Sequence, residues 1–485
     1  MANTLLLLSL ATVLLATAAA EASPELKSGS FYSPPFEMTP GKVVFDYFYG
    51  VDFPTGHLAV KTFRADLVDD DDNVIPFHEV YLHHSSMSRY YQARNYSIPS
   101  VLETETLPYS ETGGFVYRRN DGICQTDILG QYLGLGTEMQ STPYVVPDPY
   151  GMEIGDPAQI PTGFDEKWLL MVHAIDTRGA VDQFGCTECR RDLYNVSVDG
   201  LGRELDQFGE PLPDDYYGGL SCCYAHTRCK IKEGFHAPAR MIRLRYSMTW
   251  TEWEPSIVPV RVYIFDITDE MKLKVSPETG AVTAEHDCGL EYMVESCHVK
   301  GPKNNIIAPE DDDDDKRCAD FQKTIVPMPN GGDVIFGLTH LHGGAINSTI
   351  YGQDGRVLCK TEPIYGEGEE EGYIVGISTC QPEPGSVWIN DGEMIVHETV
   401  YTAGRRRTGV MGLFYLLVAD RRPTTPPAAT SFLRLPSLLA EKVTVGTGVT
   451  ATSGAVVGVG MLLVAAVVVV VVGKRTKAGG GCTWV

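Results

Sequence analysis

The sequence has little positive charge. Lys and Arg together number 39, against 63 Asp and Glu, so the net charge is −24. Proteins that bind nucleic acid need a basic surface, and this balance excludes nucleic acid as an expected partner. The chain also lacks a Gly-x-Ser-x-Gly elbow, a phosphate-binding loop and a dinucleotide fingerprint. The motifs that most directly identify a hydrolase or a nucleotide-dependent enzyme are therefore absent from the sequence.

The two ends of the chain predict a secreted, membrane-anchored protein. An apolar run at residues 5–20 is followed by small residues, which is typical of a signal peptide over residues 1–22. Residues 451–473 carry no charge and are long enough to cross a bilayer, and the basic segment 474–485 that follows indicates the cytoplasmic side. The alternative is a cleaved glycolipid anchor, whose signal would end in its apolar tail. We expect a single-pass type I protein of the secretory pathway, with an extracellular ectodomain at the plasma membrane.

The segment beside the predicted span has two further features. Residues 421–450 contain Pro-Thr-Thr-Pro-Pro and many small residues, which predicts a stalk rather than a folded core. Within the span, Gly454 and Gly458 have the spacing on which two membrane helices pack. A homodimer through the span is one interpretation, and the ordinary frequency of small residues in spans is the other.

The cysteines suit an oxidising compartment. Eleven of the twelve precede the predicted span, where disulfides are expected and where an odd number leaves one thiol free or paired between chains. The group Cys186, Cys189, Cys222, Cys223 and Cys229 could be read as a zinc site, but the compartment favours disulfides. The chain also has three acceptor sequences for N-glycosylation, at Asn95, Asn195 and Asn347.

The ectodomain is predicted to be mainly β. Segments rich in Val, Ile, Tyr and Thr alternate apolar with polar residues, and turns rich in Gly, Pro and Asp separate them. The expected strands are 42–49, 75–82, 239–251, 258–267, 333–339 and 394–401. Many short strands over this length predict two jelly-roll or β-sandwich domains in tandem, followed by the C-terminal transmembrane helix.

The predicted domain boundary is an acidic linker at residues 301–317. It separates an N-terminal sandwich, residues 23–300, from a C-terminal sandwich, residues 318–420. The first sandwich would carry a cysteine-rich insertion at about residues 186–234. The acidic runs at 69–72 and within the linker are typical of solvated loops, and they lack the Asp/Asn/Gly spacing of a calcium loop.

Five histidines stand in or beside expected strands. His340 and His342 are two residues apart, so both can face one ion from the same side of a strand. His83 and His84 are adjacent and would point apart unless the strand ends or distorts there. His173 lies in the apolar strand Leu-Leu-Met-Val-His. Taken singly, each is more simply a hydrogen-bonded core histidine, so only their combination carries a functional hypothesis.

The order of these residues resembles that of the copper type II, ascorbate-dependent monooxygenases, the peptidylglycine α-hydroxylating and dopamine β-monooxygenases. In both, an adjacent His pair precedes a third His in an apolar strand, then a His-x-His and a late Met. The resemblance implies two copper sites, one on each domain, formed by His83, His84 and His173 and by His340, His342 and Met411. It further implies ascorbate as reductant, dioxygen as oxidant, and Tyr415, four residues after Met411, as a catalytic candidate.

The chemistry of the proposed ligands agrees with copper, while one departure limits the substrate. Imidazole binds copper, zinc and iron, but the soft thioether of Met411 favours Cu(I). Taken alone, Met411 would be ordinary core filling. In the peptide-amidating enzymes an arginine two residues before the His-x-His binds the peptide carboxylate, and here that position is Leu338. Peptide amidation is therefore not predicted, and the substrate, a small molecule or a peptide, stays open.

A nearer resemblance covers more of the ectodomain. Segments such as Gly-Gly-Leu-Ser-Cys-Cys-Tyr at 218–224 and Thr-His-Leu-His-Gly-Gly at 339–344 are similar to the plant stress up-regulated Nod 19 family, which implies no mechanism. The leading hypothesis is a membrane-anchored copper protein with monooxygenase-like oxidoreductase activity. The alternatives are a non-catalytic, stress-related copper-binding or recognition protein of the cell surface, and a disulfide-stabilised stress protein without metal.

Overall fold

The computed structural model describes residues 25–98, 101–102, 114–125, 129–134, 136–205, 209–214, 216, 218, 227–280, 282–298, 306–307 and 318–421. The predicted signal peptide, stalk, span and tail lie outside these residues, apart from Arg421, and so does most of the acidic linker. Within the described part of the chain, no helix is long and apolar enough to cross a membrane. The predicted span is therefore untested by the structure.

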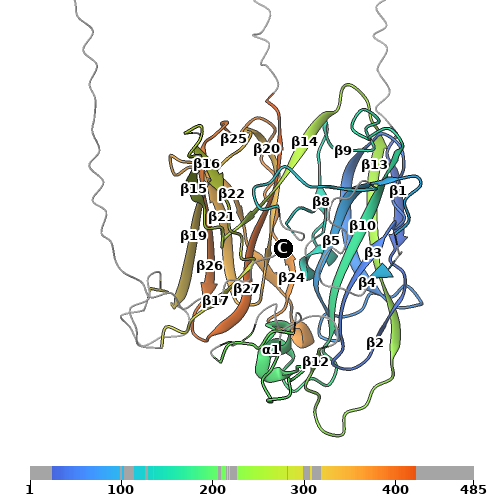
Figure 1. Cartoon of the computed structure of the whole chain (residues 1–485), viewed down its shortest axis with the longest axis vertical. Helices are drawn as coiled ribbons and strands as arrows, with labels where there is room; N and C mark the ends of the chain where they lie inside the picture. The colour runs from blue at the N-terminus through green and yellow to red at the C-terminus, as the bar shows by residue number, and fades with distance from the viewer. Residues whose placement is uncertain are drawn as a thin grey trace, which may run out of the picture. The chain divides into compact units, whose positions relative to one another are not determined.

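An eleven-stranded sheet runs through both predicted domains (Figure 1). Its strands lie in the order β1 (Lys27–Tyr32), β13 (Arg240–Glu252), β4 (Leu58–Val68), β9 (Tyr150–Ile154), β14 (Val258–Asp266), β27 (Arg407–Ala419), β20 (Gly332–Leu341) and β25 (Trp388–Ile389). Three short strands attach to β13, β4 and β27 respectively: β2 (Phe36–Met38), β8 (Tyr144–Val145) and β17 (Glu291–Val294). Because β14 precedes the predicted linker and pairs with β27 after it, this sheet joins the two halves of the chain.

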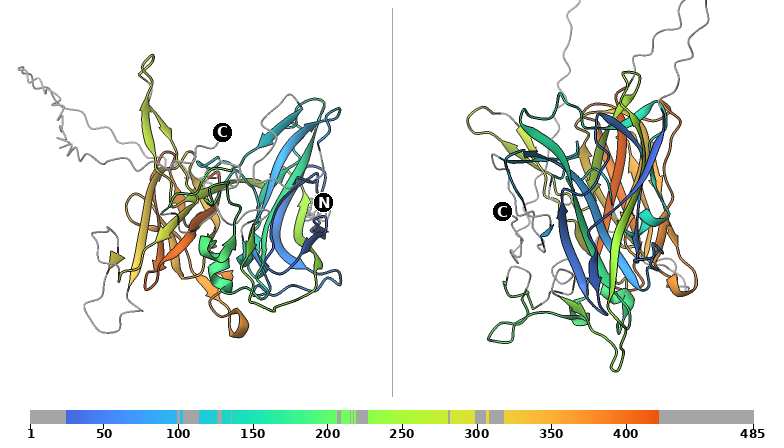
Figure 2. Two further views of the ribbon diagram at one scale, coloured as in Figure 1. Left: turned by 60° about the horizontal axis from the view of Figure 1, so that its bottom comes forward. Right: turned by 90° about the vertical axis from the view of Figure 1, so that its right-hand side faces the viewer.

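Two five-stranded sheets accompany the long sheet, and Figure 2 shows their strands in blue to green and in yellow to orange. The first has the order β6 (Val101–Leu102), β3 (Val43–Tyr49), β10 (Phe164–Asp176), β5 (Val80–Ala93) and β7 (Phe115–Arg118). The second has the order β18 (Ile306–Ile307), β19 (Ala319–Pro327), β26 (Met394–Thr402), β21 (Ala345–Tyr351) and β22 (Val357–Thr361).

Short elements fill the remaining described residues. The two-stranded ladders are β11 (Tyr194–Asn195) with β12 (Arg228–Cys229), β15 (Lys272–Val275) with β16 (Val282–Glu285), and β23 (Pro363–Tyr365) with β24 (Ile374–Ile377). The helical elements are α1 (Gln183–Thr187) and the 3₁₀ turns η1 (Thr137–Gln140), η2 (Arg191–Leu193) and η4 (Gly368–Glu370). The described structure is thus mainly β, as the sequence predicts.

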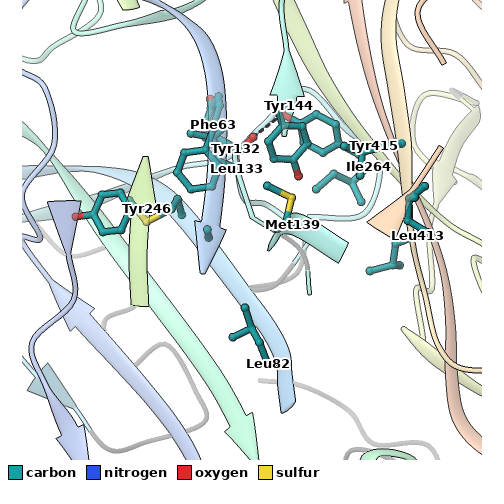
Figure 3. Packing of buried hydrophobic residues seen from close by; sticks show 14 of the residues in the cluster. Phe63, Leu82, Tyr132, Leu133, Met139, Tyr144, Tyr246, Ile264, Leu413 and Tyr415 are labelled. Carbon is teal, nitrogen blue, oxygen red and sulfur yellow. Dashed lines mark hydrogen bonds between the residues drawn. The ribbon is translucent and has the colours of Figure 1, made fainter. Parts of the chain in front are cut away.

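Strand β27 is buried on both faces. Phe414, Leu416 and Val418 pack into the core of the C-terminal strands, whereas Leu413 and Tyr415 pack into the larger core that also holds N-terminal strands (Figure 3). Successive side chains of a strand point to opposite faces, so one continuous apolar run can serve two cores. This alternation directs every second residue of β27 toward the N-terminal half of the fold.

Five of the six expected strands match β3, β13, β14, β20 and β26 to within about two residues at most ends. The prediction of a strand over residues 75–82 is wrong for residues 75–79. Pro76 begins a turn there, in which its carbonyl accepts hydrogen bonds from the backbone N–H groups of Glu79 and Val80. Strand β5 starts only at Val80 and continues to Ala93, so the histidine pair lies inside a strand rather than at its end.

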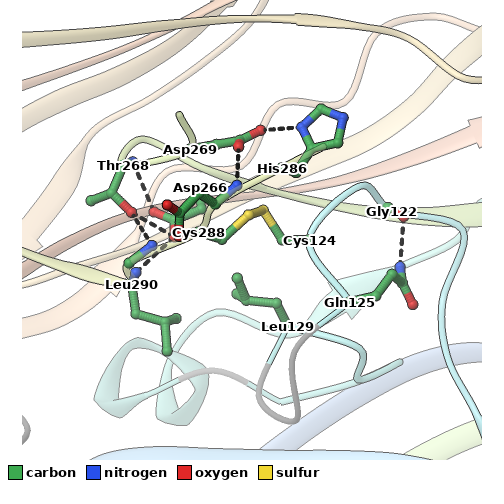
Figure 4. The surroundings of a disulfide bond; sticks show 12 residues. Gly122, Cys124, Gln125, Leu129, Asp266, Thr268, Asp269, His286, Cys288 and Leu290 are labelled. Atoms are coloured by element: carbon green, nitrogen blue, oxygen red, sulfur yellow. Dashed lines mark hydrogen bonds and ion pairs between the residues drawn. A yellow bond between two sulfur atoms is a disulfide. The ribbon is translucent and has the colours of Figure 1, made fainter. Parts of the chain in front are cut away.

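Four disulfides lie within the described residues: Cys124–Cys288, Cys186–Cys229, Cys297–Cys318 and Cys359–Cys380. Cys189 is disulfide-bonded as well. The bond from Cys186 to Cys229 confirms the disulfide interpretation over a zinc site for that pair. The bond from Cys124 to Cys288 ties the segment after β7 to the segment before β17, beside the hydrogen-bonded Asp269 and His286 (Figure 4).

Candidate metal centre

Strand β5 has an irregular register at the adjacent histidines. In its pairing with β10, His84 lies opposite His173, but the next residue of β10, Ala174, lies opposite Leu82, so His83 is passed over. Such a β-bulge adds a residue to one strand and re-aims its side chain. The rings of His83 and His84 are consequently 4.4 Å apart between centroids, with their Nδ1 atoms 2.6 Å apart. The distortion that the sequence argument requires is present.

The second ligand set comes from β20, β27 and the turn after β20. His340 and His342 bring their Nε2 atoms within 3.3 Å of each other. Nitrogens bound at 2.0–2.1 Å to one tetrahedral ion are about 3.3 Å apart, so this spacing suits a shared ion. Met411 on β27 places its sulfur 3.1 Å from Nε2 of His84. A residue of the second set therefore contacts a residue of the first.

The two predicted sets meet in one place. His83, His84 and His173 form one group of candidate ligand atoms within 4.8 Å of one another, and His84, His340 and His342 form another. We call the six residues His83, His84, His173, His340, His342 and Met411 the histidine–methionine cluster. The resemblance implies one site on each domain, whereas here His84 is common to both groups. The long sheet produces this arrangement because it presents alternate residues of β20 and β27 to the N-terminal strands.

The cluster is closed from solvent. None of its six side chains is more than 4% exposed. Burial, and then the neighbouring histidines, hold the pKa of His83 and of His84 well below the usual 6.5, and the same causes lower the pKa of His342. These rings are therefore neutral at physiological pH, the protonation state in which an imidazole nitrogen can bind a metal.

A buried carboxylate supports one of the candidate ligands. Glu138 on η1 is fully buried, and its two oxygens lie 3.0 Å and 3.2 Å from Nδ1 of His340. A carboxylate in this position fixes the tautomer of the ring and leaves Nε2 to bind a metal. Gly136 makes room for the ring, since a Cβ there would come within 2.5 Å of Cε1 of His340. Nothing in the local sequence around Glu138 predicts this contact.

Tyr401 links the two C-terminal ligand strands. Its hydroxyl accepts a hydrogen bond of 2.8 Å from the backbone N–H of His342 and donates one of 2.7 Å to the carbonyl of Met411. One fully buried hydroxyl thus holds the backbones of two cluster residues at a set separation. Tyr401 and Glu138 are the two supporting residues that the sequence argument does not identify.

The donor set agrees with a soft, redox-active metal. Five imidazoles belong to two candidate groups that share His84, a thioether lies beside His84, and no carboxylate belongs to either group. Thioether sulfur prefers Cu(I), and imidazole accepts both copper oxidation states. Buried polar rings that face one another are costly unless their nitrogens are bound, which an ion would accomplish. The residues present therefore fit copper.

The remaining predicted residues lie elsewhere. Tyr415 is fully buried, its hydroxyl donates a 2.6 Å hydrogen bond to the carbonyl of Tyr132, and its ring is 4.4 Å from Tyr144. The glycosylation acceptors Asn95 and Asn195 are exposed, whereas Asn347 on β21 is half-buried. These residues keep their predicted roles as hypotheses.

Comparison with known proteins identifies a family. No curated protein matches the chain. Among solved structures, the infectious bursal disease virus VP2 subviral particle has 8% sequence identity and a TM-score of 0.15, with 82% of this chain and 72% of that chain covered. The Gx strain of the same virus has 9% identity and a TM-score of 0.14, with 84% and 75% covered.

Neither score is high enough to carry an argument about fold. The model of the family described as Stress up-regulated Nod 19 matches residues 24–421, which takes in both ligand sets and the strands that carry them. The chain therefore belongs to the Stress up-regulated Nod 19 family.

Proposed function

We propose that this protein is a membrane-anchored extracellular copper protein with monooxygenase-like oxidoreductase activity, using ascorbate and dioxygen. The observation that supports it is the convergence of five histidines and one methionine from four strands and one turn into a single buried cluster. Four disulfides accord with a chain that folds in an oxidising compartment, where dioxygen is available.

The protein's own residues would each have a distinct task. His83, His84 and His173 supply nitrogens from the N-terminal strands, and His340 and His342 supply nitrogens from the C-terminal side. Glu138 holds the proton on Nδ1 of His340, so that Nε2 stays available. When bound, copper would supply one-electron redox chemistry with dioxygen and a reductant. The apolar surroundings exclude bulk water from the cluster.

The two candidate groups of histidines share His84. One compact centre therefore describes them better than two separate sites do. Because His84 belongs to both groups, two ions held there would share a ligand neighbourhood and influence each other's affinity. Loss of His84 should therefore weaken both positions, whereas separate sites would lose only one.

A second candidate function is copper binding without turnover. The burial of all six cluster residues, none more than 4% exposed, favours it, because a substrate must approach the reacting centre of an oxygenase. The replacement of the carboxylate-binding arginine by Leu338, which is fully buried on β20, favours it too.

Copper stoichiometry and oxygen consumption distinguish these functions. We expect purified protein loaded with copper and dialysed to retain about two ions per chain, and the Met411→Ala variant to retain less. Ascorbate-dependent oxygen uptake that is abolished by Met411→Ala would support the oxidoreductase, whereas retained copper without uptake would support the binding protein. Protein that retains no copper overturns both.

A further inference from the structure

A pocket of about 620 Å³ reaches the edge of the histidine–methionine cluster. His342 and Tyr81 lie in its wall, together with α1 and the turns after β20 and β26. The ring of Tyr81 is also 5.8 Å from that of His83. This volume is in the range of small-molecule sites, about 300–1,000 Å³. The pocket is therefore a route by which a small molecule can approach a cluster that is otherwise buried.

The wall beside His342 carries an unequal set of charges. Glu188, 6% exposed, accepts hydrogen bonds from Arg405 at 2.8 Å and 3.3 Å and from Arg407 at 3.4 Å. Two guanidinium groups face the one buried carboxylate here, and the pocket's other carboxylates, Glu369 and Glu371, are exposed at its rim, so the inner wall carries an excess of positive charge. A buried or half-buried charge of this kind is costly without an anion.

The position of Arg407 is built into the backbone. Its guanidinium donates to the side chain and the carbonyl of Thr402, at 3.0 Å and 3.3 Å, and is 12% exposed. Gly344 gives it space, because a Cβ at that glycine would come within 2.1 Å of Cζ of Arg407. Arg405 is half exposed and keeps N–H groups beyond the two that bond Glu188. One arginine is thus fixed and the other can turn toward a ligand.

We propose that this pocket binds a small monoanion, of the carboxylate or enolate class, on Arg405 and Arg407 beside His342. The inference rests on the proposed copper centre for its functional meaning and names the class of molecule that reaches it. Arginine forks bind planar anions through paired hydrogen bonds. The exposed Glu369 and Glu371 at the rim of the pocket repel anions in proportion to their charge, which favours a monoanion over multiply charged anions.

Acetate is a suitable probe, and bound Cu(II) reports its approach. In full-length protein loaded with Cu(II), the methyl protons of acetate should relax faster in a saturable manner, and zinc-loaded protein is the diamagnetic control. Arg405→Ala should raise the apparent Kd for acetate about tenfold, the loss expected for a charge-assisted contact. Glu188→Gln should lower the Kd, because it removes the carboxylate that competes for both arginines.

Arg94→Ala is the matched control, because Arg94 lines a different pocket of about 800 Å³. A Kd that changes equally in Arg405→Ala and Arg94→Ala overturns the inference, as does the absence of saturable relaxation in protein that holds copper. Protein without copper overturns the proposed function instead. In that case saturation-transfer NMR of acetate with metal-free protein still decides whether the pocket binds a monoanion and whether Arg405 contributes.

Discussion

Two regions of this molecule bury histidine completely, and they do so in different ways. His397 on β26 lies in the C-terminal sandwich, where Nε2 is 2.9 Å from the hydroxyl of Ser348 and 3.3 Å from that of Thr399. In the cluster, the ring nitrogens of His83 and His84 face each other and His84 also faces the sulfur of Met411. Nε2 of His397 has hydroxyl partners, whereas the cluster histidines lie against other imidazoles, and His84 also against the sulfur of Met411.

The difference teaches that burial by itself does not identify a ligand. Nε2 of His397 bonds two hydroxyl groups, which are not the donors that a soft metal selects. Several imidazoles whose nitrogens lie within 4.8 Å of one another, with a thioether beside His84, form a donor set that suits copper. His397 therefore serves as an internal reference for a structural histidine, and variants of the two regions test the distinction directly.

The largest expected effect follows from removing the histidine common to both groups. His84→Ala should lose nearly all bound copper and the thermal stabilisation that copper confers, which for a ligand at a thousand times its Kd is about 4 kcal/mol. The measurements are metal content and unfolding with and without copper. His397→Ala should keep wild-type copper content, although it too loses a buried ring. Equal loss of copper in both variants would remove the distinction between the regions.

Removal of the supporting carboxylate should have a smaller effect. Glu138→Gln retains the volume of the side chain but weakens its hold on the proton of His340, so copper affinity should fall about 10- to 100-fold. Competition with a chelator of known affinity measures it. The control is the Glu393→Gln variant. Glu393 is 3% exposed and forms an ion pair with Arg356, and neither residue belongs to the histidine–methionine cluster. An unchanged affinity in Glu138→Gln would mean that His340 is not a ligand.

Acid should reveal the structural role of His397. Burial lowers the pKa of His397 from 6.5 to about 3. Between these values the unfolded chain takes up a proton that the folded chain does not, so stability is complete above pH 6.5 and falls as the pH drops toward 3. The slope contributed by one such group is at most about 1.4 kcal/mol per pH unit. His397→Asn should remove that slope in denaturant titrations between pH 6 and pH 4, and an unaltered slope would contradict the assignment.

The smallest expected effect concerns Tyr415. Tyr415→Phe removes the hydrogen bond to the carbonyl of Tyr132, which should lower the free energy of unfolding by about 1 kcal/mol and leave copper content unchanged. Denaturant unfolding and metal analysis measure these. A fall in ascorbate-dependent oxygen uptake of more than about tenfold would instead give this hydroxyl the catalytic role that the resemblance implies.

Much of the fold follows from local pattern. The alternation of apolar and polar residues predicts β3, β13, β14, β20 and β26, because a half-buried strand repeats every two residues. It fails at residues 75–79, where Pro76 imposes a turn on residues of high β propensity. The same local pattern cannot reveal that β14 pairs with β27, since strand pairing depends on residues about 150 positions apart.

The candidate site likewise has residues that the sequence identifies and residues that only the structure identifies. All six cluster residues are identifiable from their order and type, whereas Glu138 and Tyr401 are not, because their roles exist only through contacts made in the folded chain. The sequence argument places the two ligand sets in separate predicted domains, and the pairing of β14, β27 and β20 in one sheet brings the two sets side by side. No local sequence pattern predicts that the two ligand sets contact each other.

By itself, the sequence determined the β character of residues 25–421, the disulfide chemistry and the candidate metal ligands. The first two depend on residue type or on a period of two along a strand, whereas the set of six ligands depends on the resemblance of their order to that of the copper monooxygenases. Only the tertiary structure decided that His83 and His84 can turn to one side, because the bulge exists only in the pairing of β5 with β10. It also decided that Met411 contacts His84, since β27 is buried on both faces and its alternate residues face the N-terminal strands.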